Sequence, residues 1–157
     1  STMSLRQVKP SDIDLLLGWA NDLDMRRNSF STQLIDYNTH KVWFENKIKS
    51  ADSLLFIASV GGRAVGQIRF DRDKSSAFID YFIDSKFRGL GLGSSIIGLG
   101  IKMLLKEWQN TCKIKAIVKN SNIASQKALI KNTFKSTKSG ESILFEYIVL
   151  ENSTSAL

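Results

Sequence analysis

The feature that most constrains the fold is a glycine-rich loop at residues 88–94, in which glycine stands at every second position from 89 to 93. An apolar segment of period two, residues 76–83, precedes the loop, and a helical apolar repeat follows it. Glycine allows tight turns, so several backbone N–H groups converge at the start of the helix. Unpaired amides and the helix dipole both favour negative charge there. The loop therefore predicts a phosphate-binding site.

The predicted site comprises the whole loop: Arg88, Gly89, Leu90, Gly91, Leu92, Gly93 and Ser94. Arg88 would add positive charge, or its side chain would fix the loop. A dinucleotide-binding GxGxxG starting at Gly89 needs glycine at Ser94 and an acid about 20 residues later, where Gln109 and Asn110 stand. A P-loop needs Gly-Lys-Ser/Thr, which is absent. The remaining alternatives are another phosphate-binding family and a loop–helix joint without a ligand.

The hydrophobic periodicity along the chain predicts one mixed α/β domain over residues 1–157. Three consecutive strands are expected before the loop, joined by a tight Gly61-Gly62 hairpin and a turn at residues 71–74. The polar stretch at 21–38 is expected to be partly irregular. The expected strands are 4–9, 54–60, 64–70, 76–83, 114–118, 134–138 and 142–150, and the expected helices are 13–20, 39–49, 97–108 and 122–132.

The net charge of +7 is unevenly distributed, since residues 102–138 carry nine lysines and one acid. This excess indicates an anionic partner or a solvated face. No nucleic-acid-binding motif accompanies it, so a phosphorylated small molecule is the sharper interpretation. Cys112 is the only cysteine, which excludes an internal disulfide and leaves no metal-ligand cluster. No apolar run approaches the ~20 residues that cross a bilayer, and a cytoplasmic protein without a metal is expected.

The spacing of Arg88, Gly91 and Gly93, Arg-x-x-Gly-x-Gly between a strand and a long helix, resembles the pyrophosphate motif of the GNAT superfamily of acetyltransferases. Asn122-x-x-Ser125, continuing to Lys131-Asn-Thr-Phe134, is similar to a second family segment. The resemblance implies a GNAT fold: a mixed central sheet of about seven strands with flanking helices and splayed fourth and fifth strands. It also implies acetyl-CoA as co-substrate.

In such proteins the pantetheine arm fills the gap between the splayed strands. The resemblance implies that Asn122 contacts this arm and that Ser125 lies nearby, although both would also serve as helix-capping residues. It further implies that a backbone N–H of Phe82 or Ile83 points at the thioester carbonyl. Such a donor stabilises the oxyanion that develops when an amine attacks.

The N-terminal half resembles a GNAT branch that N-acetylates UDP-linked 4-amino sugars for surface glycans. The resembling segments are 19–22, 26–30, 40–44 and 65–71. The resemblance implies a small-molecule amine acceptor, a UDP-amino sugar, whose diphosphate would meet arginines and whose flat parts would meet aromatic rings. The expected substrate-binding residues are Arg26, Arg27, Asn28, His40, Trp43 and Arg69. The alternatives are a ribosomal-protein N-terminal acetyltransferase and a non-catalytic CoA sensor.

The residues that move protons are less defined. Many family members use a tyrosine four residues after the motif serine as the acid, and Leu129 stands there. Tyr81 is the nearest alternative in sequence, but strand alternation is expected to turn it away from the site. Asp80, His40 and a water relay are the candidates for the base; otherwise His40 is a helix-surface residue and Trp43 a core residue. A homodimer in which the long final strand pairs with a second copy is possible by analogy.

Overall fold

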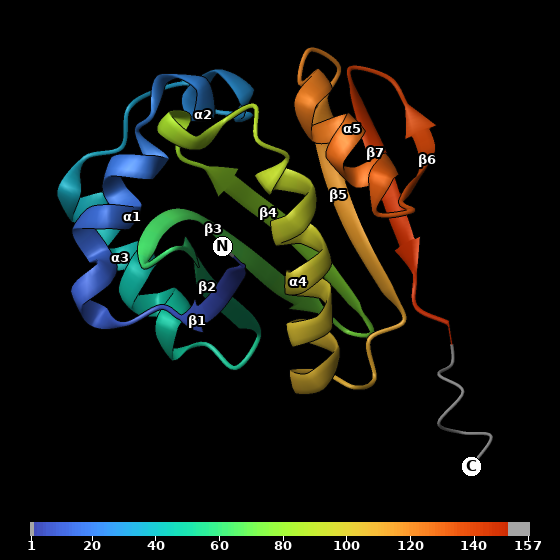
Figure 1. Cartoon of the computed structure of the whole chain (residues 1–157), viewed down its shortest axis with the longest axis horizontal. Helices are drawn as coiled ribbons and strands as arrows, with labels where there is room; N and C mark the ends of the chain where they lie inside the picture. The colour runs from blue at the N-terminus through green and yellow to red at the C-terminus, as the bar shows by residue number, and fades with distance from the viewer. Residues whose placement is uncertain (1, 151–157) are drawn as a thin grey trace.

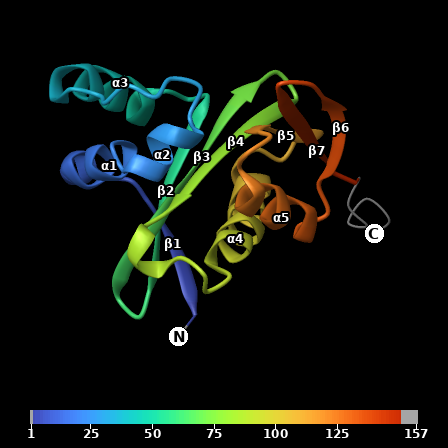
Figure 2. The same cartoon turned by 90° about the horizontal axis from the view of Figure 1, so that it is seen from above.

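The computed structural model describes residues 2–150, which form a seven-stranded mixed sheet with helices on both faces (Figures 1 and 2). The predicted α/β architecture is confirmed. The sheet order is β1-β2-β3-β4-β5-β7-β6. The strands are β1 (Met3–Gln7), β2 (Ser53–Val60), β3 (Arg63–Asp73), β4 (Ser76–Ile83), β5 (Lys113–Lys119), β6 (Lys135–Ser139) and β7 (Ser142–Ile148). The α-helices are α1 (Ile13–Ala20), α2 (Leu23–Asn28), α3 (Tyr37–Lys49), α4 (Leu92–Glu107) and α5 (Ile123–Lys131).

Two apolar clusters hold the layers together, one on each face of the sheet. On one face α4 and α5 pack onto the strands through residues such as Ile97, Leu104 and Leu129. On the other face α1 and α3 pack through Trp19 and Phe44 onto β2 and β4. Figure 2 shows the two helical layers on opposite sides of the sheet. Among the helices of residues 2–150, none combines the length and apolar character that crossing a membrane demands.

The meander β2-β3-β4 has the predicted first turn and a shorter second turn. Gly61 and Gly62 have φ of 58° and 78°, the left-handed pair that a two-residue hairpin needs. β3 continues to Asp73, beyond the predicted start of the turn at residue 71. Ion pairs hold these polar residues in the ladder, since Lys47 bonds Asp71 at 2.6 Å and Arg72 bonds Asp52 at 3.2 Å.

The polar segment expected to be partly irregular contains the short helix α2. The Asp22 side chain caps it by accepting from the N–H groups of Asp24 and Met25 at 2.9 and 3.1 Å. No residue of α2 is fully buried, and its apolar packing comes from Met25, which lies against the cluster of α1 and α3. The stretch that follows is tied back to α1, because the Asn21 amide exchanges two hydrogen bonds with the backbone of Ile35 at 2.7 and 2.8 Å.

β4 and β5 are parallel and paired only at Ser76–Phe78 with Lys113–Lys115. Beyond this short ladder both strands continue without pairing to each other, which confirms the predicted splay. β7 lies between β5 and β6, and β6 pairs with it from Ile143 to Glu146. The pairing of the final strand with a second copy stays a prediction.

Gly100 sets how closely α4 approaches the sheet. A Cβ at this position would lie 2.6 Å from Ile68 Cδ1 and 3.2 Å from Phe70 Cζ. Gly100→Ala is therefore expected to lower the free energy of unfolding by about 1–3 kcal/mol through overpacking. The control is Gly18→Ala in α1, where no heavy atom lies within 4 Å and the change is expected to raise that free energy by about 0.5–1 kcal/mol. Urea denaturation measures both; equal shifts would contradict the expected close approach.

Candidate active site

The glycine loop opens onto a cavity of about 710 Å³, here called the donor cavity. Gly89 and Gly91 have φ of 79° and 76°, and Gly91 is the N-cap of α4. The first amides of α4 have no partner within the helix, which makes this end attractive to phosphate. The loop residues that line the donor cavity are Arg88, Gly89, Gly91, Leu92, Gly93 and Ser94. Leu90 does not line it, and its side chain is 68% exposed.

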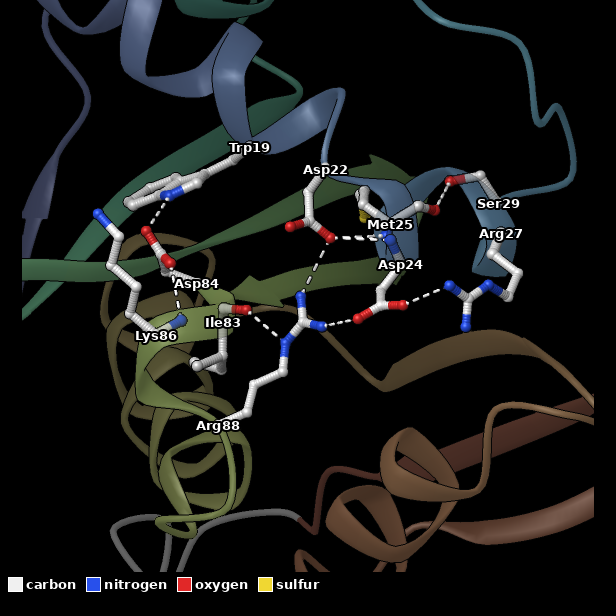
Figure 3. A network of polar contacts seen from close by, with 10 residues as sticks. All are labelled: Trp19, Asp22, Asp24, Met25, Arg27, Ser29, Ile83, Asp84, Lys86 and Arg88. Atoms are coloured by element: carbon white, nitrogen blue, oxygen red, sulfur yellow. Dashed lines mark hydrogen bonds and ion pairs between the residues drawn. The ribbon is translucent and has the colours of Figure 1, made fainter.

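Arg88 is the centre of a polar network that joins β4, the glycine loop and α2 (Figure 3). Its Nε donates to the Ile83 carbonyl at 3.1 Å, and its guanidinium pairs with Asp22 at 3.3 Å and with Asp24. Asp24 in turn pairs with Arg27 at 2.8 Å. The positive charge of Arg88 is therefore shared with two carboxylates. Its side chain fixes the loop, as one of the two sequence interpretations expected.

The gap between β4 and β5 connects the donor cavity with a second cavity of about 540 Å³, here called the acceptor cavity. The Asp84 N–H donates to the Val65 carbonyl at 2.8 Å. Because amides alternate along an antiparallel pair, the N–H groups of Tyr81 and Ile83 face the gap, and that of Phe82 faces β3. Of the two predicted oxyanion donors, the geometry favours the N–H of Ile83. The N–H of Tyr81 is a further candidate, because it also faces the gap.

Gly66 lets β3 approach the part of β4 that borders the gap. A Cβ at this position would lie 2.2 Å from the Phe82 carbonyl oxygen and 3.2 Å from Ile83 Cα. Any larger residue would have to displace the β4 backbone, because under 3.0 Å something must shift. In the sequence Gly66 belongs to a segment noted only for its resemblance. The structure gives it a physical role in positioning β4.

The acceptor cavity is walled by α1, α2, α3 and the adjacent faces of β3 and β4. The residues predicted for substrate binding or catalysis that line it are Arg26, Asn28, His40, Trp43, Arg69 and Asp80. Arg27 lines the donor cavity instead, so its contact with an acceptor stays a prediction. Trp43 and its neighbour Phe44 have different roles. Phe44 is a core residue that is 1% exposed, whereas Trp43 forms a wall of the cavity.

Charges at the floor of the acceptor cavity are balanced around Arg69. Its guanidinium bonds Asp71 at 2.8 Å and Asp80 at 3.3 Å, and its Cζ lies 5.2 Å from the centre of a Trp43 ring. Burial alone would raise the pKa of Asp71, but hydrogen bonds from Lys47 and Ser53 and the charge of Arg69 outweigh it, so this pKa lies below the usual carboxyl value. Asp71 is thus a fixed anion, and the Asp80 side chain remains 42% exposed.

Arg26 reaches from α2 into the loop that follows. Its guanidinium donates to the carbonyls of Ser31 and Gln33 at 3.1 and 3.2 Å and to the Ser29 hydroxyl at 3.2 Å. Its Nε is buried, and no described residue accepts a hydrogen bond from it. Arg26 therefore shapes the cavity wall.

His40 is 2% exposed and faces α1, so the helix-surface alternative is wrong. Its Nε2 lies 3.0 Å from the Ile13 carbonyl, which can only accept, so Nε2 carries the proton. The ring stacks on Trp43 at 5.7 Å between centroids. Burial lowers the pKa of His40 despite the opposing hydrogen bond to Ile13 and the charge of Asp14. The imidazole is therefore neutral near pH 7, and it supports the Trp43 wall.

The start of α5 closes both cavities. Asn122 caps this helix by accepting from the Ser125 N–H at 3.2 Å, and both side chains line both cavities. Leu129, at the position of the expected acid, is 1% exposed. Tyr81 also lines both cavities, so the expectation that strand alternation turns it away from the site is wrong.

A sheet that opens beside an amide-rich loop defines a class of enzyme that binds a phosphorylated, strand-like donor. A family model described as an acetyltransferase (GNAT) domain matches residues 2–135. The chain belongs to this family and is an N-acetyltransferase that uses acetyl-CoA. No significant similarity to a curated protein is found. Within residues 2–150, His, Cys, Asp and Glu side chains form no group of three or more that could hold a metal.

Solved structures share the fold at low sequence identity. A domain from Methanocaldococcus jannaschii superposes with a TM-score of 0.83 at 20% identity, covering 95% of this chain and 99% of its own. The aminoglycoside acetyltransferase AAC(6')-Ib with ribostamycin and coenzyme A gives 0.83 at 15%, with 94% of each chain covered. Spermidine N-acetyltransferase from Vibrio cholerae with CoA and spermine gives 0.83 at 13%, covering 93% and 95%.

Substitutions of Gly91 test whether the glycine loop binds phosphate. Gly91→Asp is expected to abolish CoA binding, because its carboxylate would stand where a phosphate binds. Gly91→Asn is the matched control: aspartate and asparagine both tolerate the left-handed backbone and have the same size. Isothermal titration is expected to give at least a tenfold larger loss of CoA affinity for aspartate than for asparagine. Equal affinities in two folded variants would contradict phosphate binding at this loop.

His40 makes stability depend on pH. Its pKa is lower in the folded protein than the unfolded value of about 6.5, so the unfolded state binds the proton first as pH falls. The free energy of unfolding is therefore expected to fall on acidification from pH 6.5 down to the folded pKa. His40→Gln keeps an N–H donor and removes the titration, so it should flatten this part of the profile. Chemical denaturation at several values from pH 5 to 8 measures the free energy of unfolding of both proteins. If the wild type and His40→Gln showed the same dependence on pH, a neutral buried imidazole would be contradicted.

Proposed function

We propose that the acceptor is the primary amine of an amino sugar linked to a nucleoside diphosphate. The observation that carries the proposal is the pairing of guanidinium groups with a flat indole in the acceptor cavity. Arg26, Arg69 and Trp43 line it, and the Arg69 guanidinium lies 5.2 Å from the centre of a Trp43 ring. Guanidinium groups bind diphosphate oxygens bidentately, and an indole face suits a uracil ring or a sugar methyl group.

The balance of charge in the cavity suits an acceptor that carries both signs. Arg69 is held between Asp71 and Asp80, so the cavity is not a purely cationic surface. An amino-sugar nucleotide presents a negative diphosphate at one end and an ammonium group at the other. Asp80, part-exposed in the cavity, is the carboxylate available to the ammonium end.

The proposed reaction begins when the amine loses a proton. Asp80 takes this proton directly or through a water, and the neutral nitrogen attacks the thioester carbon. The backbone N–H groups of Tyr81 and Ile83 face the gap and donate to the oxyanion that forms. Such preorganised donors are each worth roughly 3–4 kcal/mol in well-studied cases.

Proteins of the same fold offer a precedent for a small-molecule amine acceptor. The structures of two neighbours contain ribostamycin and spermine. An N-terminal acetyltransferase would instead receive a protein chain, and a CoA sensor would bind the donor without releasing thiol.

Titration and turnover with UDP-amino sugars test the proposal. Arg69→Gln is expected to raise the KM for the sugar nucleotide at least tenfold and to leave CoA affinity unchanged, because it removes one diphosphate contact. Arg72→Gln is the matched control on the same strand: its guanidinium lies over Trp108, outside both cavities, and its KM should equal that of the wild type.

Three outcomes would overturn the amino-sugar proposal. Turnover of a peptide N-terminus without heat from any UDP-sugar would favour the N-terminal acetyltransferase. Tight CoA binding without thiol release from a broad panel of amines would favour the sensor. Equal KM values for Arg69→Gln and Arg72→Gln would contradict the proposed contact between Arg69 and the diphosphate.

A further inference from the structure

Acetyl transfer ends with a proton on the sulfur of CoA, and the chain lacks the residue that usually supplies it. A thiol has a pKa of about 8.5, so protonation assists its departure near neutral pH. The position expected to hold the acid is Leu129, an apolar side chain that is 1% exposed. The acid must therefore come from another residue that borders the donor and the acceptor together.

The junction of the two cavities limits the choice. Its shared lining residues are Met25, Asn28, Tyr81, Phe82, Asn122 and Ser125. Thioether and phenyl groups carry no such proton, amides do not ionise in water, and an aliphatic hydroxyl is far too weak an acid. A phenol, with a pKa near 10, is the one group of this set that can protonate a thiolate and recover its proton from solvent.

We infer that Tyr81 is the catalytic acid that protonates the CoA sulfur as the carbon–sulfur bond breaks. The inference depends on acetyl transfer to an amine, not on the amino sugar proposed above. In the step, the nitrogen–carbon bond has formed and the tetrahedral intermediate collapses. The electron pair of the carbon–sulfur bond goes to sulfur, and the phenol proton follows it. The phenolate then regains a proton from solvent. The nitrogen gave one proton to Asp80 or water before the attack, and it releases a second proton to solvent as the amide forms.

The placement of the Tyr81 side chain supports this role. It lies against the first turn of α4, since a Cβ at Gly93 would stand 3.4 Å from its Cε2 and 3.6 Å from its hydroxyl oxygen. The ring therefore spans from β4 to the helix end that binds phosphate, alongside the gap between β4 and β5. Ser125, on the first turn of α5, forms a hydrogen bond with the phenol from the opposite side of this gap.

The surroundings keep the phenol protonated until it is needed. Burial raises the pKa of Tyr81, the hydrogen bond with Ser125 lowers it in part, and the negative charge of Asp80 raises it again. The net pKa lies above the ordinary value of 10.0. Near pH 7 the side chain is therefore the acid form, which is the form that the step requires.

Tyr81→Phe removes only the hydroxyl and tests the assignment. The expected result is a fall in kcat of roughly 100-fold, the lower end for loss of a general acid, with CoA affinity unchanged. The matched control is Tyr147→Phe, where the ring packs at 5.4 Å against Phe134 and the change should leave kcat within twofold. Thiol release from acetyl-CoA measures kcat with the UDP-amino sugar or with whichever amine of the panel reacts fastest.

The pH profile separates an acid from a structural residue. Wild-type kcat is expected to decline at alkaline pH as the phenol ionises, and this decline should be absent in Tyr81→Phe. Ser125→Ala removes the contact that lowers the phenol pKa, so its decline should move to higher pH. An unchanged alkaline limb in Tyr81→Phe, or a kcat within twofold of wild type, would overturn the assignment. Failure of every UDP-amino sugar alongside turnover of another amine would overturn only the acceptor proposal.

Discussion

The unpaired stretch between β4 and β5 is the constraint on which the rest of the molecule depends. A sheet normally satisfies its buried N–H and C=O groups by pairing neighbouring strands. Here the ladder ends at Phe78, and β4 continues to Ile83 with one edge free. Two apolar layers hold the sheet from both sides, so the gap does not collapse. An extended donor arm satisfies such an edge in the way a strand would.

Polar contacts position α2 against this gap, together with the packing of Met25 on the apolar cluster of α1 and α3. The helix has no buried residue, yet its Met25 and Asn28 border both cavities. Arg88 connects α2 to the end of β4 by bonding the Ile83 carbonyl on one side and two aspartates on the other (Figure 3). Because one guanidinium fixes the glycine loop and α2 together, the shapes of the donor and acceptor cavities are coupled.

Local periodicity predicted the strands and helices, and the family resemblance predicted that β4 and β5 splay apart; which side chains border the gap was predicted less well. Period-two apolar segments and Gly91 specified the strands and the phosphate loop, since both act through neighbouring residues. Alternation does place Tyr81 and Asp80 on opposite faces of β4, but it could not show that side chains of both faces reach a cavity beside the gap. The partners of Arg88 were likewise hidden, because Asp22 and Asp24 lie more than 60 residues earlier in the chain.

Asp80 and Tyr81 lie on opposite faces of β4, and under the proposals above this strand therefore has three roles. Asp80 lies beside Arg69 on the acceptor face, the backbone of β4 meets the thioester in the gap, and the Tyr81 ring lies against α4 on the donor face. A base, oxyanion donors and an acid thus follow one another along one strand. A slip of one residue would exchange the two faces. The close approach of β3 at Gly66 helps to hold the register of β4, because a Cβ at this position would lie 2.2 Å from the Phe82 carbonyl oxygen. This register points Asp80 and Tyr81 to opposite faces of the strand.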